Sequence, residues 1–207
     1  MIRVAIVDRQ PAVRAGLDAI VAAQPDLVAV GGAPDDRALW PLLHRARPDV
    51  VVLDASPAPE ALALCLRVKS RLLAPRVVLF ADAVTSDAIV PAAVAGADAI
   101  ADKAADVREL LHAIRTVARG DSALPRFTPG LQAQAAARLS LADRAIFAMR
   151  LAGTDQSDIA ATVGLSVDDL EARTVAILAT LSAREAPSAT APAPARALPR
   201  ARTARGG

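Results

Sequence analysis

The sequence predicts an α/β domain followed by a small all-α domain, and three observations support this. Short β-branched runs alternate with amphipathic stretches through residues 1–120, which is the pattern that βαβ units produce. Apolar residues return at helical spacing over residues 139–181. From residue 182 the chain is rich in Pro, Ala and Arg without periodicity, so we expect a disordered tail over residues 182–207.

The first 120 residues are expected to contain five strands, each followed by a helix. The strands are predicted at Arg3–Val7, Leu27–Gly31, Val50–Leu53, Arg76–Phe80 and Ala99–Ala101, and the helices near residues 11–23, 36–46, 59–70, 86–95 and 106–119. Right-handed crossovers favour one flavodoxin-like (βα)5 sheet in the order 2-1-3-4-5. The ends of the first and third strands are then neighbours. Asp8 and Asp54 should therefore converge where such sheets bind ligands.

The second half begins with a linker over residues 121–138, in which Pro125 and Pro129 indicate a connector that is either flexible or packed. Breaks at Gly153 and at Val163–Ser166 divide residues 139–181 into three helices with a tight turn before the last. This is the plan of a helix-turn-helix domain, with Val167–Leu181 as the recognition helix and Ser166 as its N-cap.

Composition and charge restrict the classes of function. No apolar run approaches the roughly 18 residues of a membrane span, and the N-terminus lacks a secretory pattern, so we expect a cytoplasmic protein without membrane contact. The single cysteine, Cys65, is expected to be a buried structural thiol. His44 and His112 have no ligand spacing around them. Neither a Gly-rich nucleotide loop nor the Asp-x-Asp of a phosphohydrolase is present, so we do not expect an enzyme.

Several segments together resemble the response regulators of the NarL/FixJ type, which carry a LuxR-type helix-turn-helix domain. The likeness spans about residues 2–181. In the first domain it rests on Val4–Asp8, Pro11–Leu17, Val50–Asp54 and Ala93–Asp98 with Lys103, and in the second on Ala152–Gly153, Asp158–Ala160, Val163–Ser166 and Ile177–Leu178. The resemblance implies a receiver domain over residues 1–120 and a DNA-binding domain over residues 139–181.

The resemblance also implies roles for three charged residues. Asp54 would be the phosphoacceptor, Asp8 and Asp54 would hold Mg²⁺, and Lys103 would bind the phosphoryl oxygens. A carboxylate that attacks a phosphoryl group is an anion approaching an anion, so a metal ion and a lysine must offset the developing charge. A sensor histidine kinase would be the phosphoryl donor.

The expected receiver site departs from the family pattern at three positions. Arg9 replaces the second metal-binding acid, which should weaken Mg²⁺ binding. Ala81 replaces the hydroxyl residue that contacts the phosphoryl group, and Ile100 replaces the aromatic residue that reports the switch. We therefore expect impaired or atypical phosphorylation. In a second interpretation the acids form a structural ion cluster, which Arg9 and Lys103 neutralise without a metal.

The expected DNA-binding half is acidic. Residues 139–181 sum to −3, and the recognition helix begins with Asp168, Asp169 and Glu171, whereas residues 182–207 sum to +4. Since phosphate contacts depend on cations, this domain should bind DNA weakly without the tail. The candidate DNA contacts are Arg173, Thr174 and Gln156.

Two functions remain open from the sequence. The first is a DNA-binding transcriptional regulator of the two-component type, acting as a homodimer or as a heterodimer with a related regulator. The second is a phosphorylation-independent interaction protein that binds a partner protein or a small ligand without sequence-specific DNA binding.

Overall fold

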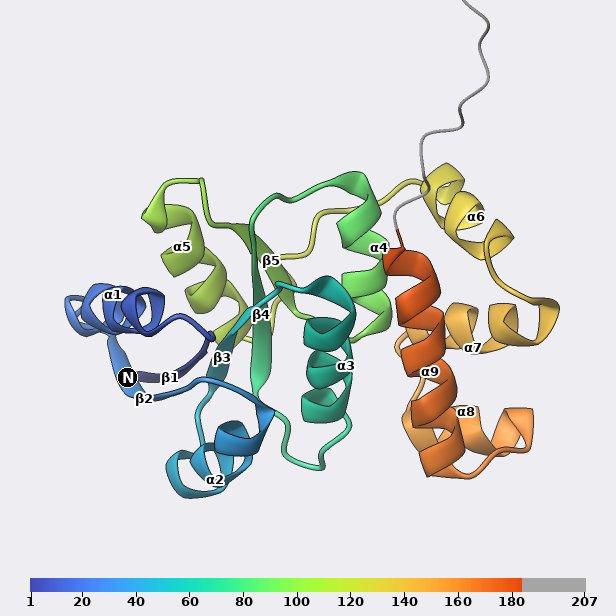
Figure 1. Cartoon of the computed structure of the whole chain (residues 1–207), viewed down its shortest axis with the longest axis horizontal. Coiled ribbons are helices and arrows are strands. Elements are labelled where there is room, and N and C mark those ends of the chain that lie inside the picture. The colour runs from blue at the N-terminus through green and yellow to red at the C-terminus, as the bar shows by residue number, and fades with distance from the viewer. Residues whose placement is uncertain (184–207) are drawn as a thin grey trace, which may run out of the picture.

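The computed structural model describes residues 1–183 and confirms the predicted sheet (Figure 1). Five parallel strands lie in the order β2-β1-β3-β4-β5. Their bounds are β1 Ile2–Val7, β2 Leu27–Ala33, β3 Val50–Asp54, β4 Arg76–Ala81 and β5 Ala99–Asp102. The predicted tail falls almost wholly on residues 184–207, which lie outside the described residues.

Helices cover both faces of the sheet, because side chains alternate along each buried strand. Val4 and Ile6 of β1 pack toward α1 (Pro11–Ala22) and α5 (Val107–Ala118). The intervening Ala5 and Val7 pack on the opposite face. That face is covered by α2 Asp36–Ala46, α3 Ala58–Lys69 and α4 Ser86–Val94. The sheet is therefore buried on both sides, and its loops supply the functional groups.

Up to residue 183, the C-terminal region contains four helices, one more than we predicted. They are α6 Pro129–Ala137, α7 Leu141–Leu151, α8 Gln156–Val163 and α9 Val167–Ser182. Helix α6 lies within the segment expected to be a linker. The turn before α9 has Gly164 in the left-handed conformation, with φ 69°. The side chain of Ser166 accepts a hydrogen bond from the Asp169 amide, which confirms the predicted N-cap.

The connector between the domains is packed at its start. The amide of Ala123 donates to the carbonyl of Asp98 at 2.8 Å, and Ala123 pairs with Ala99 beside β5. The Ser122 hydroxyl donates to the same carbonyl at 3.3 Å. The sequence left open whether the connector is flexible or packed, and this stretch of it is packed.

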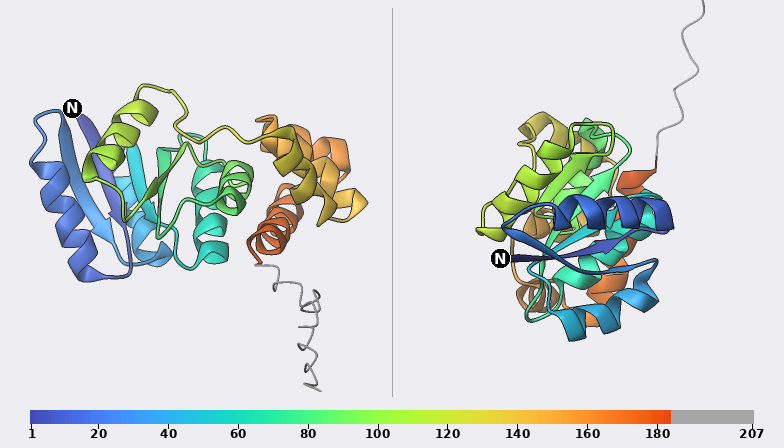
Figure 2. Two further views of the ribbon diagram at one scale, coloured as in Figure 1. Left: turned by 90° about the horizontal axis from the view of Figure 1, so that it is seen from above. Right: turned by 90° about the vertical axis from the view of Figure 1, so that its left-hand side faces the viewer.

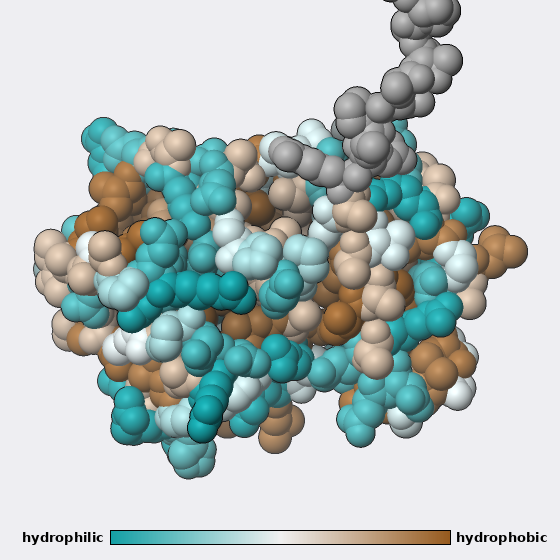
Figure 3. All heavy atoms as spheres, in the orientation of Figure 1, coloured by the Kyte–Doolittle hydropathy of each residue, from teal (hydrophilic) through white to brown (hydrophobic). Residues whose placement is uncertain are grey.

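The helical domain packs against the α/β domain through α9, which lies along α3 and α4 (Figures 1 and 2). Buried residues of α9, including Ile177 and Leu178, belong to the same apolar cluster as Leu66 of α3 and Val90 of α4. Hydrophobic residues also gather near the junction of the two domains on the face seen in Figure 3. One continuous core thus joins the expected recognition helix to the sheet domain.

Among the helices in residues 1–183, none combines the length and the apolar character required to cross a membrane.

Candidate functional site

The charged groups that the sequence singled out meet at the carboxyl end of the sheet. Val7 pairs with Leu53 across β1 and β3, so Asp8 and Asp54 emerge from adjacent strands. Both residues line a cavity of about 290 Å³. Its other polar lining residues are Arg9, Asp35, Asp36, Ser56, Glu60 and Arg67. The predicted convergence at the switch point of the sheet is present.

Asp8 is buried, with 2% of its surface exposed. Its Oδ1 accepts a hydrogen bond from the Gln10 amide at 2.7 Å. Its Oδ2 is buried and has no hydrogen-bond partner within the described part of the chain. An unpaired buried carboxylate oxygen is costly, so a group that supplies positive charge from the cavity would stabilise it.

Asp54 is paired with Lys103. The Lys103 Nζ donates to Asp54 Oδ1 at 2.6 Å and also contacts Asp82 Oδ1 at 3.0 Å. Burial by itself lowers the pKa of Lys103, but the hydrogen bonds to the two carboxylates outweigh it and raise that pKa. Lys103 is therefore a firmly charged group between two acids.

Asp82 and Ser56 complete this arrangement, and the sequence analysis missed both. The Ser56 hydroxyl donates to Asp82 Oδ2 at 2.8 Å. Hydrogen bonds from Ser56 and then from Lys103 lower the pKa of Asp82. The signal that would have found Asp82 is its position directly after β4, since β4 lies between β3 and β5 and ends at the same edge.

Arg9 lines the cavity but forms no ion pair with Asp8 or Asp54 in residues 1–183. Lys103 balances Asp54, whereas Asp8 Oδ2 lacks a cationic partner within those residues. Two neighbouring carboxylates beside an open cavity suit Mg²⁺, which commonly binds through one or two carboxylates and completes its shell with water. The residues present thus fit a metal ion better than they fit a closed ion cluster.

The two other departures lie beside the site. Ala81 is buried at the end of β4, where its methyl group cannot donate a hydrogen bond. Ile100 is buried with the core of the α3 and α4 face. The ring of Phe80 in β4 has its centre 5.9 Å from Lys103 Nζ.

The three candidate DNA contacts have different surroundings. Thr174 is fully buried, and its hydroxyl donates to the Leu170 carbonyl at 2.7 Å. Arg173 pairs with Asp143 of α7, and 49% of its side chain is exposed. Gln156 begins α8, and its Oε1 is buried without a partner in the described residues. In this arrangement of the domains Thr174 is closed to a ligand, whereas Arg173 is exposed and Gln156 is partly exposed.

Comparisons with known proteins agree with the fold. The transcriptional regulatory protein LiaR of Bacillus subtilis is 29% identical over 125 residues, which cover 60% of this chain and 59% of LiaR. The transcriptional activator DevR/DosR of Mycobacterium tuberculosis is 33% identical over 125 residues, covering 60% of this chain and 58% of that protein. The chain thus matches less than two thirds of the length of these curated relatives.

Solved structures extend the likeness. A two-component response regulator of the LuxR family from Aurantimonas superposes with a TM-score of 0.55 at 28% identity, over 64% of this chain and 92% of that one. RcsB of Salmonella enterica, solved with a promoter, superposes with a TM-score of 0.53 over 89% of this chain and 94% of that one. At 15% identity, this second match concerns the fold alone.

The most direct finding is a family match to the receiver half. The model of the response regulator receiver domain matches residues 4–115, which include Asp8, Asp54 and Lys103. This segment is more than half of the chain. The chain therefore belongs to the response regulator receiver family.

Proposed function

We propose that this chain is a two-component-type response regulator that binds DNA and regulates transcription, with a receiver that is poorly phosphorylated. The observation that carries the proposal is the connection between the two halves. Helices α3 and α4 follow the strands that end beside Asp54 and Asp82, and α9 packs on both of these helices. The charged site is thus one helix away from the expected recognition helix.

In the proposed reaction, an Asp54 carboxylate oxygen attacks the phosphorus atom of a donor, such as the phosphohistidine of a sensor kinase. The new O–P bond forms as the bond between phosphorus and the donor breaks, and the donor leaves with its electron pair. Lys103 offsets charge on the phosphoryl oxygens. Asp8 and Asp54 would hold Mg²⁺, which supplies further charge neutralisation when bound.

Two features of the site support poor phosphorylation. Arg9 places a cation beside the proposed metal site, where a second carboxylate would strengthen Mg²⁺ binding. Ala81 offers no hydroxyl to hold a phosphoryl group once it has formed. The first feature slows formation of the phosphorylated state, and the second weakens the signal that this state sends toward α4.

On the DNA side, the proposal requires α9 to leave the receiver. In the closed arrangement Thr174 is fully buried, so it cannot contact bases. Residues 139–181 also carry a net charge of −3, and the +4 of residues 182–207 would supply phosphate contacts. We expect DNA binding to be strongly dependent on salt.

The second candidate function is a phosphorylation-independent regulatory interaction protein, which binds a partner protein or a small ligand without sequence-specific DNA binding. Two features of α9 favour this function. A recognition helix that is acidic at its start and shares a core with the receiver is suited to a partner other than DNA. A partner surface of opposite charge would fit residues 139–181.

The two functions are separated by recovery of genomic DNA fragments with the full chain and with a 1–183 truncation, at low and at moderate salt. The truncation ends after Ala183, because Arg138 donates to the carbonyls of Leu181 and Ala183 and so holds the end of α9. A full-length variant with its tail arginines changed to Gln serves as the matched control for chain length.

If the chain is a transcription regulator, the full chain and the truncation should enrich the same few fragments. Binding by the full chain alone, without preference and only at low salt, would reject sequence-specific DNA binding. That outcome would support the interaction protein.

A further inference from the structure

Asp82 is exposed but held at both carboxylate oxygens. Although 72% of its side chain is accessible, Oδ1 contacts Lys103 Nζ at 3.0 Å and Oδ2 accepts from the Ser56 hydroxyl at 2.8 Å. The two partners follow different strands, β5 and β3. An exposed aspartate tied from two sides has a defined position over the end of the sheet.

In this position Asp82 would compete with a phosphoryl group on Asp54 for the ammonium group of Lys103. An ammonium group has three donors, and two of them are directed at Asp54 and Asp82. A phosphoryl group on Asp54 would need the same ammonium for its oxygens. Asp82 would then have to release Lys103, or the phosphoryl oxygens would share it with a carboxylate.

The charge of Asp82 also opposes the incoming donor. Asp54 and Asp82 both lie within contact distance of one lysine nitrogen, and Asp8 adds a third acid from the neighbouring strand. A phosphoryl donor is anionic, and at Asp54 it would lie close to these acids. Like charges at such separations raise the barrier even when solvent screens them.

We propose that Asp82 is a positioning residue which holds Lys103 in place of a phosphoryl group and thereby slows phosphorylation of Asp54. Ser56 supports this role by orienting the Asp82 carboxylate. The inference rests on the proposed function, because it concerns how readily Asp54 is phosphorylated. It adds a cause for poor phosphorylation that is independent of Arg9.

The test compares the full chain with Asp82→Asn, which keeps the shape of the side chain and removes its charge. With acetyl phosphate and Mg²⁺, we expect the initial rate of phosphorylation, followed by intact mass, to rise by about tenfold. Ser56→Ala should give a smaller increase. Asp87→Asn removes an exposed acid from the first turn of α4 and should leave the rate unchanged. Adding Asp54→Asn to the Asp82→Asn variant should abolish labelling.

A second readout excludes a merely structural effect. The affinity for Mg²⁺ should be similar in the wild type and in Asp82→Asn, whereas fluoroberyllate, a phosphoryl mimic followed by ¹⁹F NMR, should bind the variant more tightly. An Asp82→Asn rate equal to that of the wild type would overturn the inference, including the case in which neither is labelled. A loss of Mg²⁺ affinity would also overturn it, since Asp82 would then be a metal ligand.

These outcomes are independent of the DNA recovery experiment, which contains no phosphoryl donor. Failure of DNA binding would reject the transcriptional role and leave the phosphorylation rates to decide the role of Asp82.

Discussion

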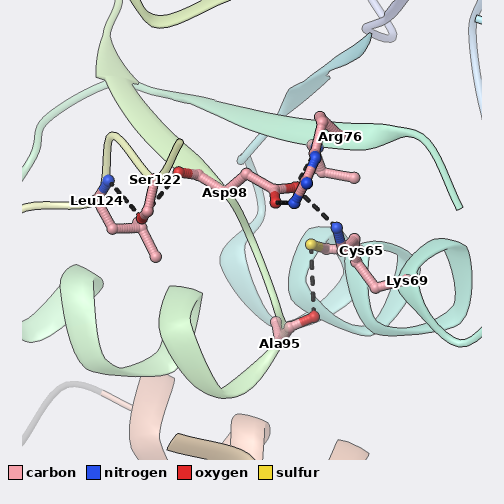
Figure 4. A network of polar contacts seen from close by, with 8 residues as sticks. Cys65, Lys69, Arg76, Ala95, Asp98, Ser122 and Leu124 are labelled. Atoms are coloured by element: carbon pink, nitrogen blue, oxygen red, sulfur yellow. Dashed lines mark hydrogen bonds and ion pairs between the residues drawn. The ribbon is translucent and has the colours of Figure 1, made fainter. Parts of the chain in front are cut away.

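The receiver contains two clusters of acids and cations at opposite ends of its sheet, and they differ in how completely the acids are paired. At the amino end, before β5, both carboxylate oxygens of Asp98 are paired (Figure 4). Arg76 donates to Oδ1 at 2.8 Å, and Lys69 and the Val77 amide donate to Oδ2 at 2.9 and 2.7 Å. At the carboxyl end, Asp8 keeps one buried oxygen without a partner in the described residues.

We interpret the difference as that between a structural cluster and a candidate binding site. Asp98 joins α3, β4 and the connector, since its carbonyl also accepts from Ser122 and Ala123. The neighbouring Cys65 is fully buried, as predicted, and burial raises the pKa of its thiol to about 12. Among residues 1–183, the cluster around Asp98 has no buried acid oxygen without a partner. Only the carboxyl end combines an unpaired acid with a cavity.

The largest effect on stability is expected at the amino end of the sheet, in the cluster around Asp98. Asp98→Ala should lower the free energy of unfolding by about 3–5 kcal/mol, because it leaves two partly buried cations and an amide without their acceptor. Denaturation with urea measures the loss. The exposed Asp87→Ala should change stability by less than about 0.5 kcal/mol. A similar small loss for Asp98→Ala would remove the distinction between the clusters.

A smaller effect is expected from restoring an acid at the carboxyl end. Arg9→Asp should raise the yield of phosphorylated protein from acetyl phosphate by about tenfold, because a second carboxylate strengthens Mg²⁺ binding. Intact mass measures the yield. Arg45→Asp reverses a charge at the exposed end of α2 and controls for net charge. If the wild type is already phosphorylated efficiently at Asp54, the receiver is not impaired and our interpretation of Arg9 is wrong.

The parts of the molecule that could be predicted follow from periodicity and topology. The strand order and the convergence of Asp8 with Asp54 follow from alternating strands and helices, because right-handed crossovers leave few arrangements. The role of Lys103 came from the family resemblance. Asp82 and Ser56 were missed because their contact depends on the path of two loops, which hydrophobic periodicity does not describe.

The helical half shows a second limit of prediction from the sequence. Helix α6 was missed because it is rich in alanine and buries no residue fully, so its sequence carries little amphipathic signal. The packing of α9 on the receiver was also not predicted. Its apolar residues Leu170, Ile177 and Leu178 are equally consistent with the core of an isolated helix-turn-helix domain.

Our central claim is that the carboxyl-end cluster is a metal-binding site and not a closed ion cluster. The most direct test compares the free energy of unfolding of the wild type and of Asp8→Asn, each with and without Mg²⁺ at constant ionic strength. At a Mg²⁺ concentration of about five times its dissociation constant, the wild type should gain about 1 kcal/mol, and Asp8→Asn should gain nothing. An equal response of the two proteins, or no response of the wild type at any Mg²⁺ concentration, would contradict the claim.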